Sequence, residues 1–328
     1  MGAGLSLTQG LGTEDSGLGP SGKREAGGRA SSCLLRVYGG VVALYVQAVV
    51  NGLLLGGVYS LMALGLSLIF GVMRVINFAH GDMMVWGMYL SLWLFLHLGV
   101  DPYLSILASG AVLFLVGVAV QRGLLNRILT APHEMQILLM LGIALVMENG
   151  ALMLFGPDPQ RVNTTYGLAT FWAGPIVFDV PRVVTFGMAF VVAFLLYVFL
   201  RRTDTGRMIR AASDNQVGAL LVGTDIRKVF ALAFGIGAAC VGVAGSLMTP
   251  FFPFTPSSGL FFTVTSFNIV VIGGMGSLLG AVVGGLLVGV SESLGAVLLV
   301  PSLKEIVTFI LMVVILIVRP QGLLGGRR

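Results

Sequence analysis

The stretch VYGGVVALYVQAVVNGLLLGGVYSLMALGLSLIFGVM, from Val37 to Met73, runs for 37 residues without a charged side chain. A helix of about 20 apolar residues is enough to cross the ~30 Å hydrocarbon core of a bilayer. The sequence RVINFAHGDMM (Arg74–Met84) follows directly and gathers Asn77, His80 and Asp82 before a second apolar run begins. This pattern predicts a long or tilted membrane span, a polar turn and a second span.

The composition of the whole chain agrees with this pattern. Of the 328 residues, 56% are hydrophobic and 10% are charged, and the mean hydropathy is +0.98. Soluble domains carry roughly 25% charged residues. Several further uncharged runs are long enough to cross a bilayer. We therefore expect an all-α polytopic integral membrane protein with no soluble domain of its own.

The number of spans follows from the interruptions in the apolar runs. No charge occurs over the 63 residues Val229–Ser291, which is too long for one crossing. The prolines of TPFFPFTP (Thr249–Pro256) break this run once, and GGMGS (Gly273–Ser277) breaks it again. We expect about nine spans, with a range of eight to ten. They are 42–72, 83–99, 103–121, 135–155, 183–200, 229–249, 261–276, 278–299 and 304–318.

The N-terminal segment, residues 1–38, differs from the rest of the chain. It is rich in glycine and serine and shows no apolar period, so it lacks the apolar surface needed to fold. We expect a disordered tail at 1–38, followed by a transmembrane permease domain at 39–328. The tail contains GLGPSGKR (Gly17–Arg24), which resembles a phosphate-binding loop, but Arg24 replaces the Ser or Thr that would hold magnesium. We expect no nucleotide site in this chain.

Metal and disulfide chemistry are also not expected. The three histidines, His80, His97 and His133, lie far apart, without the spacing of metal ligands. The two cysteines, Cys33 and Cys240, are also distant from each other, so they support neither a disulfide framework nor a metal site. The chain is expected to hold no cofactor and to be no enzyme.

The basic residues predict the orientation. The segment 201–228 carries six Lys and Arg side chains, and loops rich in these residues face the cytoplasm. Counting spans outward places the loop 122–134 and the C-terminal end inside, and the loop 156–182 outside. The tail is then also outside, although it carries four basic residues.

The segment RRTDTGRMIRAASDNQVGALLVGTDIRK (Arg201–Lys228) predicts one short cytoplasmic helix. Thr203 or Asp204 can cap its start, and Gly223 can end it in the left-handed conformation. Small and apolar residues between these caps form a face suited to a groove on a partner protein. A solvated connector helix is the alternative.

Glycine spacing predicts where helices pack closely. Gly52 and Gly56 form one Gly-x-x-x-Gly unit, which allows two helix backbones to approach within a membrane. Further units of this spacing run from the end of the seventh expected span into the eighth. Their members are Gly276, Gly280, Gly284, Gly285 and Gly289.

Polar residues inside the spans are candidates for the transport path, because ionisable groups are costly in a bilayer. Glu148 with Asn149, and Glu292, are the residues of this kind. They could face a water-filled path or could be interfacial carboxylates at helix ends.

Three ordered blocks carry a resemblance to a known family. They are NGLLLGGVYSLMALGLSLIFGVMRVINFAHGDMM (Asn51–Met84), TGRMIRAASDNQVGALLVGTD (Thr205–Asp225) and IGGMGSLLGAVVGGLLVGVSESL (Ile272–Leu294). With RPQGLLG near the C-terminus, they cover about residues 45–325. The chain resembles the membrane permeases of branched-chain amino acid ABC importers, in the broader group that includes ribose-type permeases.

The resemblance implies the fold of an ABC importer permease and a heteromeric complex in a bacterial inner membrane. A second permease subunit, identical or homologous, two cytoplasmic ATPases that hold ATP and magnesium, and an external solute-binding protein would be the partners. No nucleic acid is expected to bind. The solutes would be branched-chain or related small amino acids, with urea and short amides as the alternative within the family.

The resemblance also implies roles for particular residues. The Asn77, His80, Gly81 and Asp82 motif would lie at a cytoplasmic turn, where Gly81 permits a bend and Asn77 or Asp82 caps the next helix. The loop would dock on the ATPase through Gly206, Arg207, Arg210, Ala211, Ala212, Asp214, Gly218 and Gly223.

Two features depart from the family pattern, namely the glycine-rich tail and the charge of Glu148. A proton- or sodium-coupled secondary transporter that uses Glu148 or Glu292 is the alternative from another class, and a structural membrane subunit is a third. The 201–228 loop discriminates between them, because a secondary carrier needs no helix that docks on an ATPase.

Overall fold

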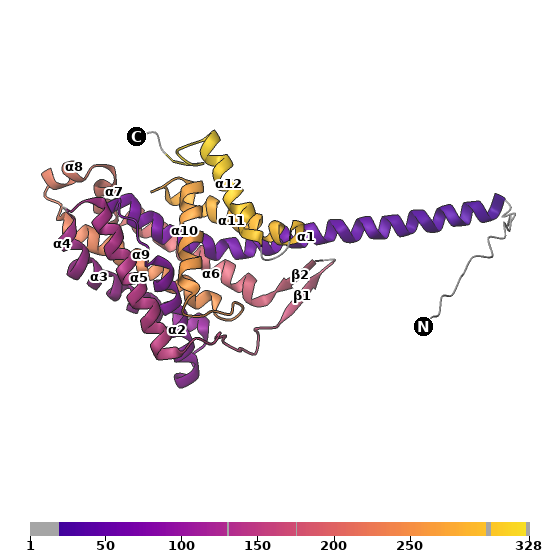
Figure 1. Ribbon diagram of the computed structural model, residues 1–328, viewed down its shortest axis with the longest axis horizontal. Coiled ribbons are helices and arrows are strands. Elements are labelled where there is room, and N and C mark those ends of the chain that lie inside the picture. Colours follow the sequence, from indigo (N-terminus) through magenta and orange to yellow (C-terminus); the bar gives the residue numbers. More distant parts are fainter. Residues whose placement is uncertain (1–19, 130, 175, 300–302, 326–328) are drawn as a thin grey trace, which may run out of the picture. The chain divides into compact units, whose positions relative to one another are not determined.

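The computed structural model describes residues 20–129, 131–174, 176–299 and 303–325. Contacts divide the chain into two compact units, residues 1–44 and 45–328. Apart from one antiparallel hairpin and an isolated β-bridge between Gln160 and Phe254, the regular secondary structure of the described residues is helical (Figure 1). The helices and strands are α1 (Pro20–Met73), α2 (His80–Leu98), α3 (Pro102–Val120), the π-helix η1 (Gln121–Leu125), α4 (Asn126–Ile128), α5 (His133–Phe155), β1 (Thr170–Ala173), β2 (Ile176–Asp179), α6 (Val180–Arg202), α7 (Asp204–Asp214), α8 (Gln216–Leu221), α9 (Ile226–Met248), α10 (Ser258–Gly273), α11 (Leu278–Leu298) and α12 (Lys304–Val318).

Helix α1 begins earlier than expected. It starts at Pro20, a residue suited to the first helical position, so residues 20–38 are helical where we expected a tail without structure. Extending an existing helix needs no new nucleation, which is the costly step. Residues 1–19 lie outside the described residues, and the role of 1–38 as a separate tail stays a prediction.

Each of the nine expected spans coincides with a helix, but the helices differ in length. Within the described ranges, six helices have the length and apolar composition of a membrane span, so the chain is a multi-pass membrane protein. Helices α10 and α12 have 16 and 15 residues, about 24 and 22 Å at ~1.5 Å per residue. The six longer spans are Val42–Met73, Pro102–Ile128, His133–Phe155, Val180–Arg202, Ile226–Met248 and Leu278–Leu298.

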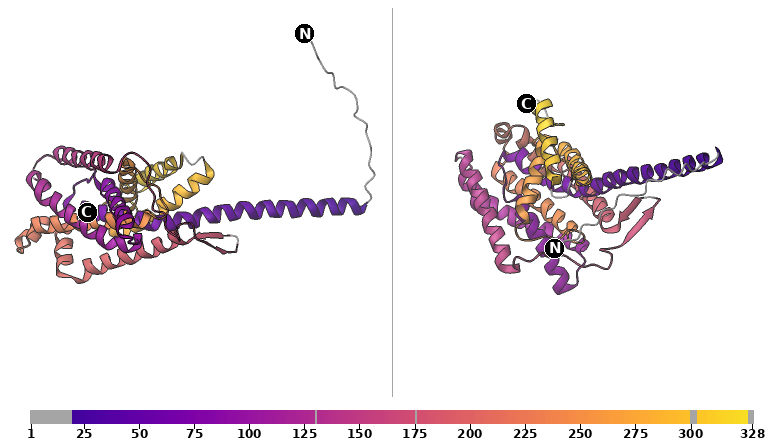
Figure 2. Two further views of the ribbon diagram at one scale, coloured as in Figure 1. Left: turned by 90° about the horizontal axis from the view of Figure 1, so that it is seen from below. Right: turned by 45° about the vertical axis from the view of Figure 1, so that its right-hand side comes forward.

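The core of the second unit is built on α1 and α9. In their apolar windows 83% of the residues are buried, against 22% for the spans of α3 and α6 and 11% for that of α5. Helix α9 packs mainly against α3 and α2, and α10 packs against α2 and α11. Helices α7 and α8 lie at the opposite end of this bundle from the β1–β2 hairpin (Figures 1 and 2).

Two of the glycine units form one contact between α1 and α11. A Cβ atom added to Gly52 would lie 2.6 Å from the Cα of Val290, and one added to Gly56 would lie 2.8 Å from the Cα of Leu286. From the other helix, a Cβ on Gly285 would meet the backbone of Ser60, and one on Gly289 would meet Gly56. Any side chain here would have to separate the two backbones.

The other three glycines of this run do not share that contact. Gly280 and Gly284 face α10, where an added Cβ would meet the backbones of Gly273 and Ile269. Gly276 precedes α11 and has a φ of +83°. Its place in the helical Gly-x-x-x-Gly series was therefore wrong, because the chain turns before the helix begins; Gly276 instead lies against Gly71.

Candidate functional site

The Asn77–Asp82 segment lies inside the helix bundle. Asn77 and His80 are fully buried, and Asp82 is 5% exposed. The Nε2 atom of His80 lies 3.0 Å from the carbonyl oxygen of Met62. Met62 is eleven residues before Met73, the last residue of α1, which is about 16 Å along a helix. The predicted turn between the two spans is therefore present, but its Asn77–Asp82 part lies at the depth of Met62 and not at the end of α1.

The chain reverses at Arg74 to reach this depth. Arg74 follows the last residue of α1 and has a φ of +55°, a left-handed conformation that is uncommon for a residue with a side chain. After it, residues 74–79 are not helical and lead back to the level of Met62, where α2 begins. The sequence suggested a bend at Gly81, but the reversal lies seven residues earlier.

Gly81 serves the approach of another helix. Its backbone N–H donates to Oγ1 of Thr263 in α10 at 2.9 Å, and a Cβ at Gly81 would lie 2.5 Å from the backbone nitrogen of Thr263. Asn77 accepts a hydrogen bond from the N–H of Ala79 at 3.1 Å, one residue before α2. Asp82 lies in the first turn of α2, and no side-chain hydrogen bond caps this helix, so the prediction that Asn77 or Asp82 caps it was wrong.

The loop 201–228 forms two helices where we expected one. Thr203 accepts a hydrogen bond from the N–H of Gly206 at 3.0 Å and so caps α7. Asn215 has an extended backbone and accepts from the N–H of Gly218 at 2.9 Å, which caps α8. The single helix that we expected is therefore divided in two at Asn215. Gly223 follows α8 with a φ of +84°, as its predicted role requires.

One face of α7 and α8 is held against the bundle. Gly206, Ile209 and Ala212 are buried. Oγ of Ser213 donates to the carbonyl oxygen of Gly71 at 2.9 Å, and Nε2 of Gln216 donates to that of Val72 at 2.9 Å. Both acceptors lie in the last turn of α1, so hydrogen bonds from α7 and α8 hold the two short helices against the end of α1.

The opposite face is exposed and mixes basic with apolar side chains. Arg207, Arg210, Ala211 and Asp214 are exposed, so the expected small-residue face is split between the two sides. Helix α8 and the residue after it expose four large apolar side chains that we had not singled out. They are Val217, Leu220, Leu221 and Val222, with 67%, 58%, 84% and 79% exposure. Their occurrence in an otherwise polar loop was the signal that could have identified them.

The start of α9 lies beside this surface. Asp225 caps α9 by accepting from the N–H of Lys228 at 3.2 Å, and its carboxylate also pairs with the Lys228 ammonium at 3.2 Å. The backbone and side-chain hydrogen bonds from Lys228 lower the pKa of Asp225 below its ordinary value. The negative charge of the cap is therefore retained at neutral pH.

The three candidate residues for the transport path do not lie together. Glu148 and Asn149 are on α5, which packs against α2; Glu148 interacts electrostatically with Asp82, and Asn149 is exposed, with its amide donating to the carbonyl of Leu145. Glu292 is on α11 and is 3% exposed. The two acidic positions therefore belong to different parts of the bundle.

Glu292 takes part in a polar network that joins three helices. Its Oε2 atom accepts a 3.0 Å hydrogen bond from the hydroxyl of Tyr59 in α1 and lies 3.9 Å from Nζ of Lys304 in α12. Neither Tyr59 nor Lys304 was expected from the sequence to take part in such a network. A lysine at the first position of an apolar helix is a signal for Lys304, whereas nothing in the pattern of α1 distinguishes Tyr59.

The end of the bundle opposite α7 and α8 has a fixed polar surface. Gln47 forms two hydrogen bonds with the backbone of Val177 in β2, at 2.7 and 2.8 Å. The hydroxyl of Tyr166 donates to the carboxylate of Asp101, which caps α3. Burial, and then the hydrogen bond to Asp101, raise the pKa of Tyr166 above its ordinary range. These contacts hold the 156–179 loop in place.

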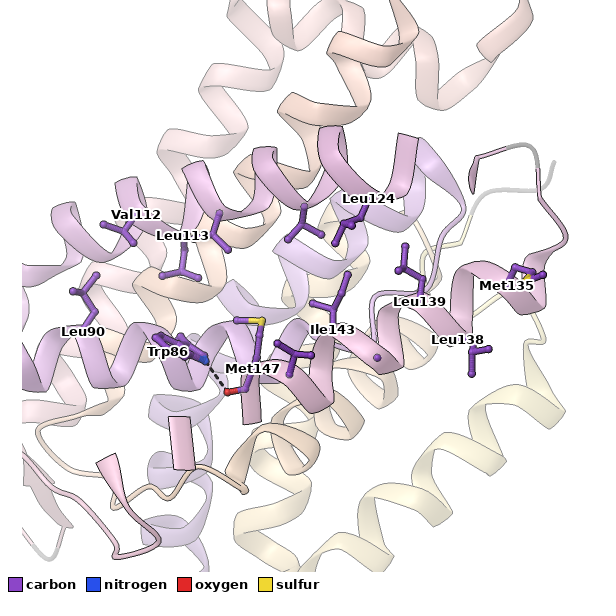
Figure 3. Close-up of a pocket in the computed structure, with 14 residues that line it drawn as sticks. Trp86, Leu90, Val112, Leu113, Leu124, Met135, Leu138, Leu139, Ile143 and Met147 are labelled. Atoms are coloured by element: carbon purple, nitrogen blue, oxygen red, sulfur yellow. Dashed lines mark hydrogen bonds between the residues drawn. The ribbon is translucent and has the colours of Figure 1, made fainter. Parts of the chain in front are cut away.

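A large groove of about 890 Å³ lies between α2, α3 and α5 (Figure 3). Its lining carries no ionisable side chain, and the indole N–H of Trp86 is already donated to the carbonyl of Met147 at 3.0 Å. An amino acid needs partners for an ammonium and a carboxylate, so this groove does not suit one. Among the described residues, no His, Cys, Asp or Glu side chains form a group suited to a metal ion.

Comparison with known proteins identifies the family. The sequence family described as branched-chain amino acid transport system, permease component, matches residues 48–316. The permease protein BraD of the high-affinity branched-chain amino acid transport system of Pseudomonas aeruginosa is 31% identical over 295 residues, covering 86% of this chain and 96% of BraD. LivH of Escherichia coli K12, described as the corresponding permease protein, is 29% identical over 294 residues, with the same coverage.

A more distant relative is the ribose import permease protein RbsC of Bacillus subtilis. It is 25% identical over 261 residues, covering 76% of this chain and 74% of RbsC. No solved structure matches the chain significantly. The family match covers more than half of the chain, and it includes the buried Asn77–Asp82 segment, both helices of the 201–228 loop and Glu292. The chain belongs to the family of permease components of branched-chain amino acid transport systems.

Proposed function

We propose that this chain is the membrane subunit of an ATP-driven importer and forms, with a second permease subunit, the path for branched-chain or related small amino acids. The names of its relatives BraD and LivH support this solute class. Two cytoplasmic ATPases carry ATP and magnesium, and an external binding protein delivers the solute. The complex lies in a bacterial inner membrane.

Nine helices cross or enter the membrane in this proposal. The six long spans are joined by α2, α10 and α12, whose apolar composition and packing against other helices support a place within the bilayer. Helix α2 begins in the bundle interior, where the hydrogen bond to Asn77 and the contact of His80 with Met62 satisfy polar groups that lipid cannot. The basic loop 201–228 faces the cytoplasm.

One observation carries the proposal: α8 exposes an apolar surface on one side and is hydrogen-bonded to the last turn of α1 on the other. Val217, Leu220 and Leu221 are exposed on α8, and a surface of this kind is typical of a docking site for another protein. Gln216, on the same short helix, binds the last turn of α1. A movement of α8 is thereby transmitted to α1, and α1 is interlocked with α11 through glycine contacts.

The sequence of events follows from this linkage. The ATPases bind α7 and α8 and move them when ATP binds and is hydrolysed. Ser213 and Gln216 pull on the end of α1, and the helices that pack on α1 open the path alternately to the two sides. This is a coupling between two distant sites through one rigid element.

The proposal is tested with the complex that copurifies with the tagged full-length chain. The complex is reconstituted in proteoliposomes, and uptake of labelled leucine is measured with and without ATP. In the variant Leu221→Asp, a charge replaces a side chain that is 84% exposed, so folding is retained while binding of the ATPase and ATP-dependent uptake are both expected to fall at least tenfold.

The matched control is Leu168→Asp, which changes an 83% exposed leucine in the loop at the opposite end of the bundle. This variant is expected to keep its ATPase. Normal ATPase binding by Leu221→Asp contradicts the docking role. Uptake by the isolated chain that needs no ATP and collapses with an ionophore supports an ion-coupled carrier instead.

A further inference from the structure

A cleft of about 390 Å³ lies between α10, α11 and α12. It differs from the large apolar groove because polar side chains from all three helices converge on it. Thr265 and Asn268 come from α10, Glu292 comes from α11, and Glu305 and Thr308 come from α12. The volume lies within the ~300–1,000 Å³ range of small-molecule sites.

Two buried polar groups in this cleft are available to a ligand. The contacts of Glu292 with Tyr59 and Lys304 both involve Oε2, and Oε1 accepts no hydrogen bond from the described residues. Asn268 is 7% exposed, and its side-chain amide makes no hydrogen bond to any described residue. A carboxylate oxygen accepts hydrogen bonds, and an amide both donates and accepts them, so both groups can bind a ligand that enters the cleft.

The rest of the cleft suits an apolar side chain. Leu260, Phe261, Val264 and Phe309 line it beside the polar groups. Nζ of Lys304 lies 5.6 Å from the ring centre of Phe261 and 3.9 Å from Oε2 of Glu292, so a positive charge lies beside an apolar and a polar residue of the lining. A ligand here meets carboxylates, an amide and an aliphatic surface within one small space, and the Lys304 ammonium lies beside two of the lining side chains.

We propose that this cleft is the site at which the permease holds a zwitterionic amino acid with an apolar side chain during its passage. The proposal rests on the proposed function. The ammonium of the amino acid binds Oε1 of Glu292, with Glu305 contributing a second negative charge. The carboxylate takes the amide N–H of Asn268 and the charge of Lys304, and the aliphatic side chain lies on Leu260 and Val264.

The Glu292 to Lys304 contact is also a structural link between α11 and α12, and that role alone would explain its burial. Asn268 and Thr265 separate the two interpretations, because neither forms part of the network with Tyr59 and Lys304. A structural link needs nothing from Asn268, whereas a ligand site does. Urea and short amides carry neither an ammonium nor a carboxylate, so this cleft discriminates against them.

The test measures binding by the assembled transporter in detergent, without the binding protein, by saturation-transfer NMR of the ligand. The probes are L-leucine, 4-methyl-2-oxopentanoate, which lacks the ammonium, and urea. Leucine is expected to bind at least tenfold more tightly than either of the other two. The variant Asn268→Ala is expected to weaken leucine binding about tenfold, which corresponds to ~1.4 kcal/mol.

The matched control is Asn163→Ala, which removes an exposed amide in the 156–179 loop and is expected to bind leucine within twofold of the wild type. Glu292→Gln is expected to lose leucine binding and to retain the complex on size-exclusion chromatography. Leucine binding by Asn268→Ala within twofold of the wild type overturns the proposal, whatever Glu292→Gln does. Equal binding of leucine and the keto acid also overturns it.

This outcome is distinguishable from failure of the proposed function. If wild-type proteoliposomes take up leucine with ATP and Asn268→Ala binds leucine as the wild type does, only the proposed amino acid site in the cleft is refuted. If leucine binding depends on Asn268 but uptake needs no ATP, the amino acid site in the cleft is supported and the proposed ATP-driven import is refuted.

Discussion

Helices α1 and α5 have the same mean hydropathy and opposite surroundings. The spans Val42–Met73 and His133–Phe155 both have a hydropathy of 2.1, yet 83% of the first window is buried and only 11% of the second. In a soluble protein, such apolar helices would both lie in the core. In a membrane, lipid is as apolar as leucine, so hydropathy indicates that a segment enters the bilayer and says little about its place in the bundle.

What lies next to the glycines distinguishes α1 from α5. In α1, an added Cβ at Gly52, Gly56 or Gly65 would collide with the backbone of a neighbouring helix. In α5, an added Cβ at Gly142 would meet nothing within 4 Å. Close backbone packing therefore fixes α1 in the centre, whereas α5 contacts one main neighbour, α2.

The largest effect that tests this comparison is expected from Gly285→Leu. The new Cβ alone would lie 2.5 Å from the backbone nitrogen of Ser60, and a backbone cannot move aside as a side chain can. Overpacking typically costs 1–3 kcal/mol, and we expect about 3 kcal/mol or more here. The measurement is the thermal unfolding midpoint of the purified protein in detergent, together with its yield.

The control for this substitution is Gly142→Leu on α5, where no atom lies within 4 Å of an added Cβ; it is expected to lose no stability and to gain somewhat less than about 1 kcal/mol from the higher helix propensity of leucine. Equal losses for the two variants would contradict the view that packing against α11 is what distinguishes the position of α1.

The second test removes a polar contact at the same helix pair. Tyr59→Phe deletes the hydroxyl that donates to Glu292 from α1. Hydrogen bonds to charged groups contribute about 1.5–3 kcal/mol, so we expect the unfolding midpoint to fall by an amount equivalent to about 2 kcal/mol. Tyr197→Phe, which removes an exposed hydroxyl that accepts from Arg201, is the control and is expected to be nearly neutral.

The sequence predicted the elements well and their depth poorly. All nine expected spans coincide with helices, and Gly223 has the predicted left-handed conformation. The depth of the Asn77–Asp82 segment was missed, because a polar motif between two apolar runs is typical of a surface turn. Only the tertiary contacts with Met62 and Thr263 show that the chain returns into the bundle before α2 begins.

The candidate site was predicted in the same uneven way. Glu292 was selected because a carboxylate in a span is costly, and it proved to be buried beside a cleft. Asn268 and Thr265, which lie in the same cleft, were not selected, because uncharged polar residues are common in membrane helices. Which side chains converge depends on the rotation of α10 about its axis, and the weak amphipathic pattern of that helix does not specify it.

A third and smaller effect is expected from removing the N-cap of α8, one of the two short helices that pack on the end of α1. Asn215→Ala removes the cap of α8, and loss of such a cap costs about 1 kcal/mol. Because α8 has only six residues, we expect its backbone amides to exchange hydrogen faster while the rest of the bundle is unaffected. Asn149→Ala, which removes no cap, provides the comparison, and unchanged exchange in α8 would contradict the capping role of Asn215.

The smallest effect is expected from replacing glycine by alanine, which should raise the unfolding midpoint in α5 and lower it in α1. Gly142→Ala in α5 adds a methyl group where no atom lies within 4 Å, and alanine favours a helix over glycine by about 0.8–1 kcal/mol. We expect a slightly higher unfolding midpoint. Gly56→Ala adds the same methyl 2.8 Å from the Cα of Leu286, so the cost of the clash exceeds the gain in helix propensity and the midpoint falls. If both variants became more stable, α1 and α11 could separate at little cost, and α1 would not transmit movement from α8 as a rigid element.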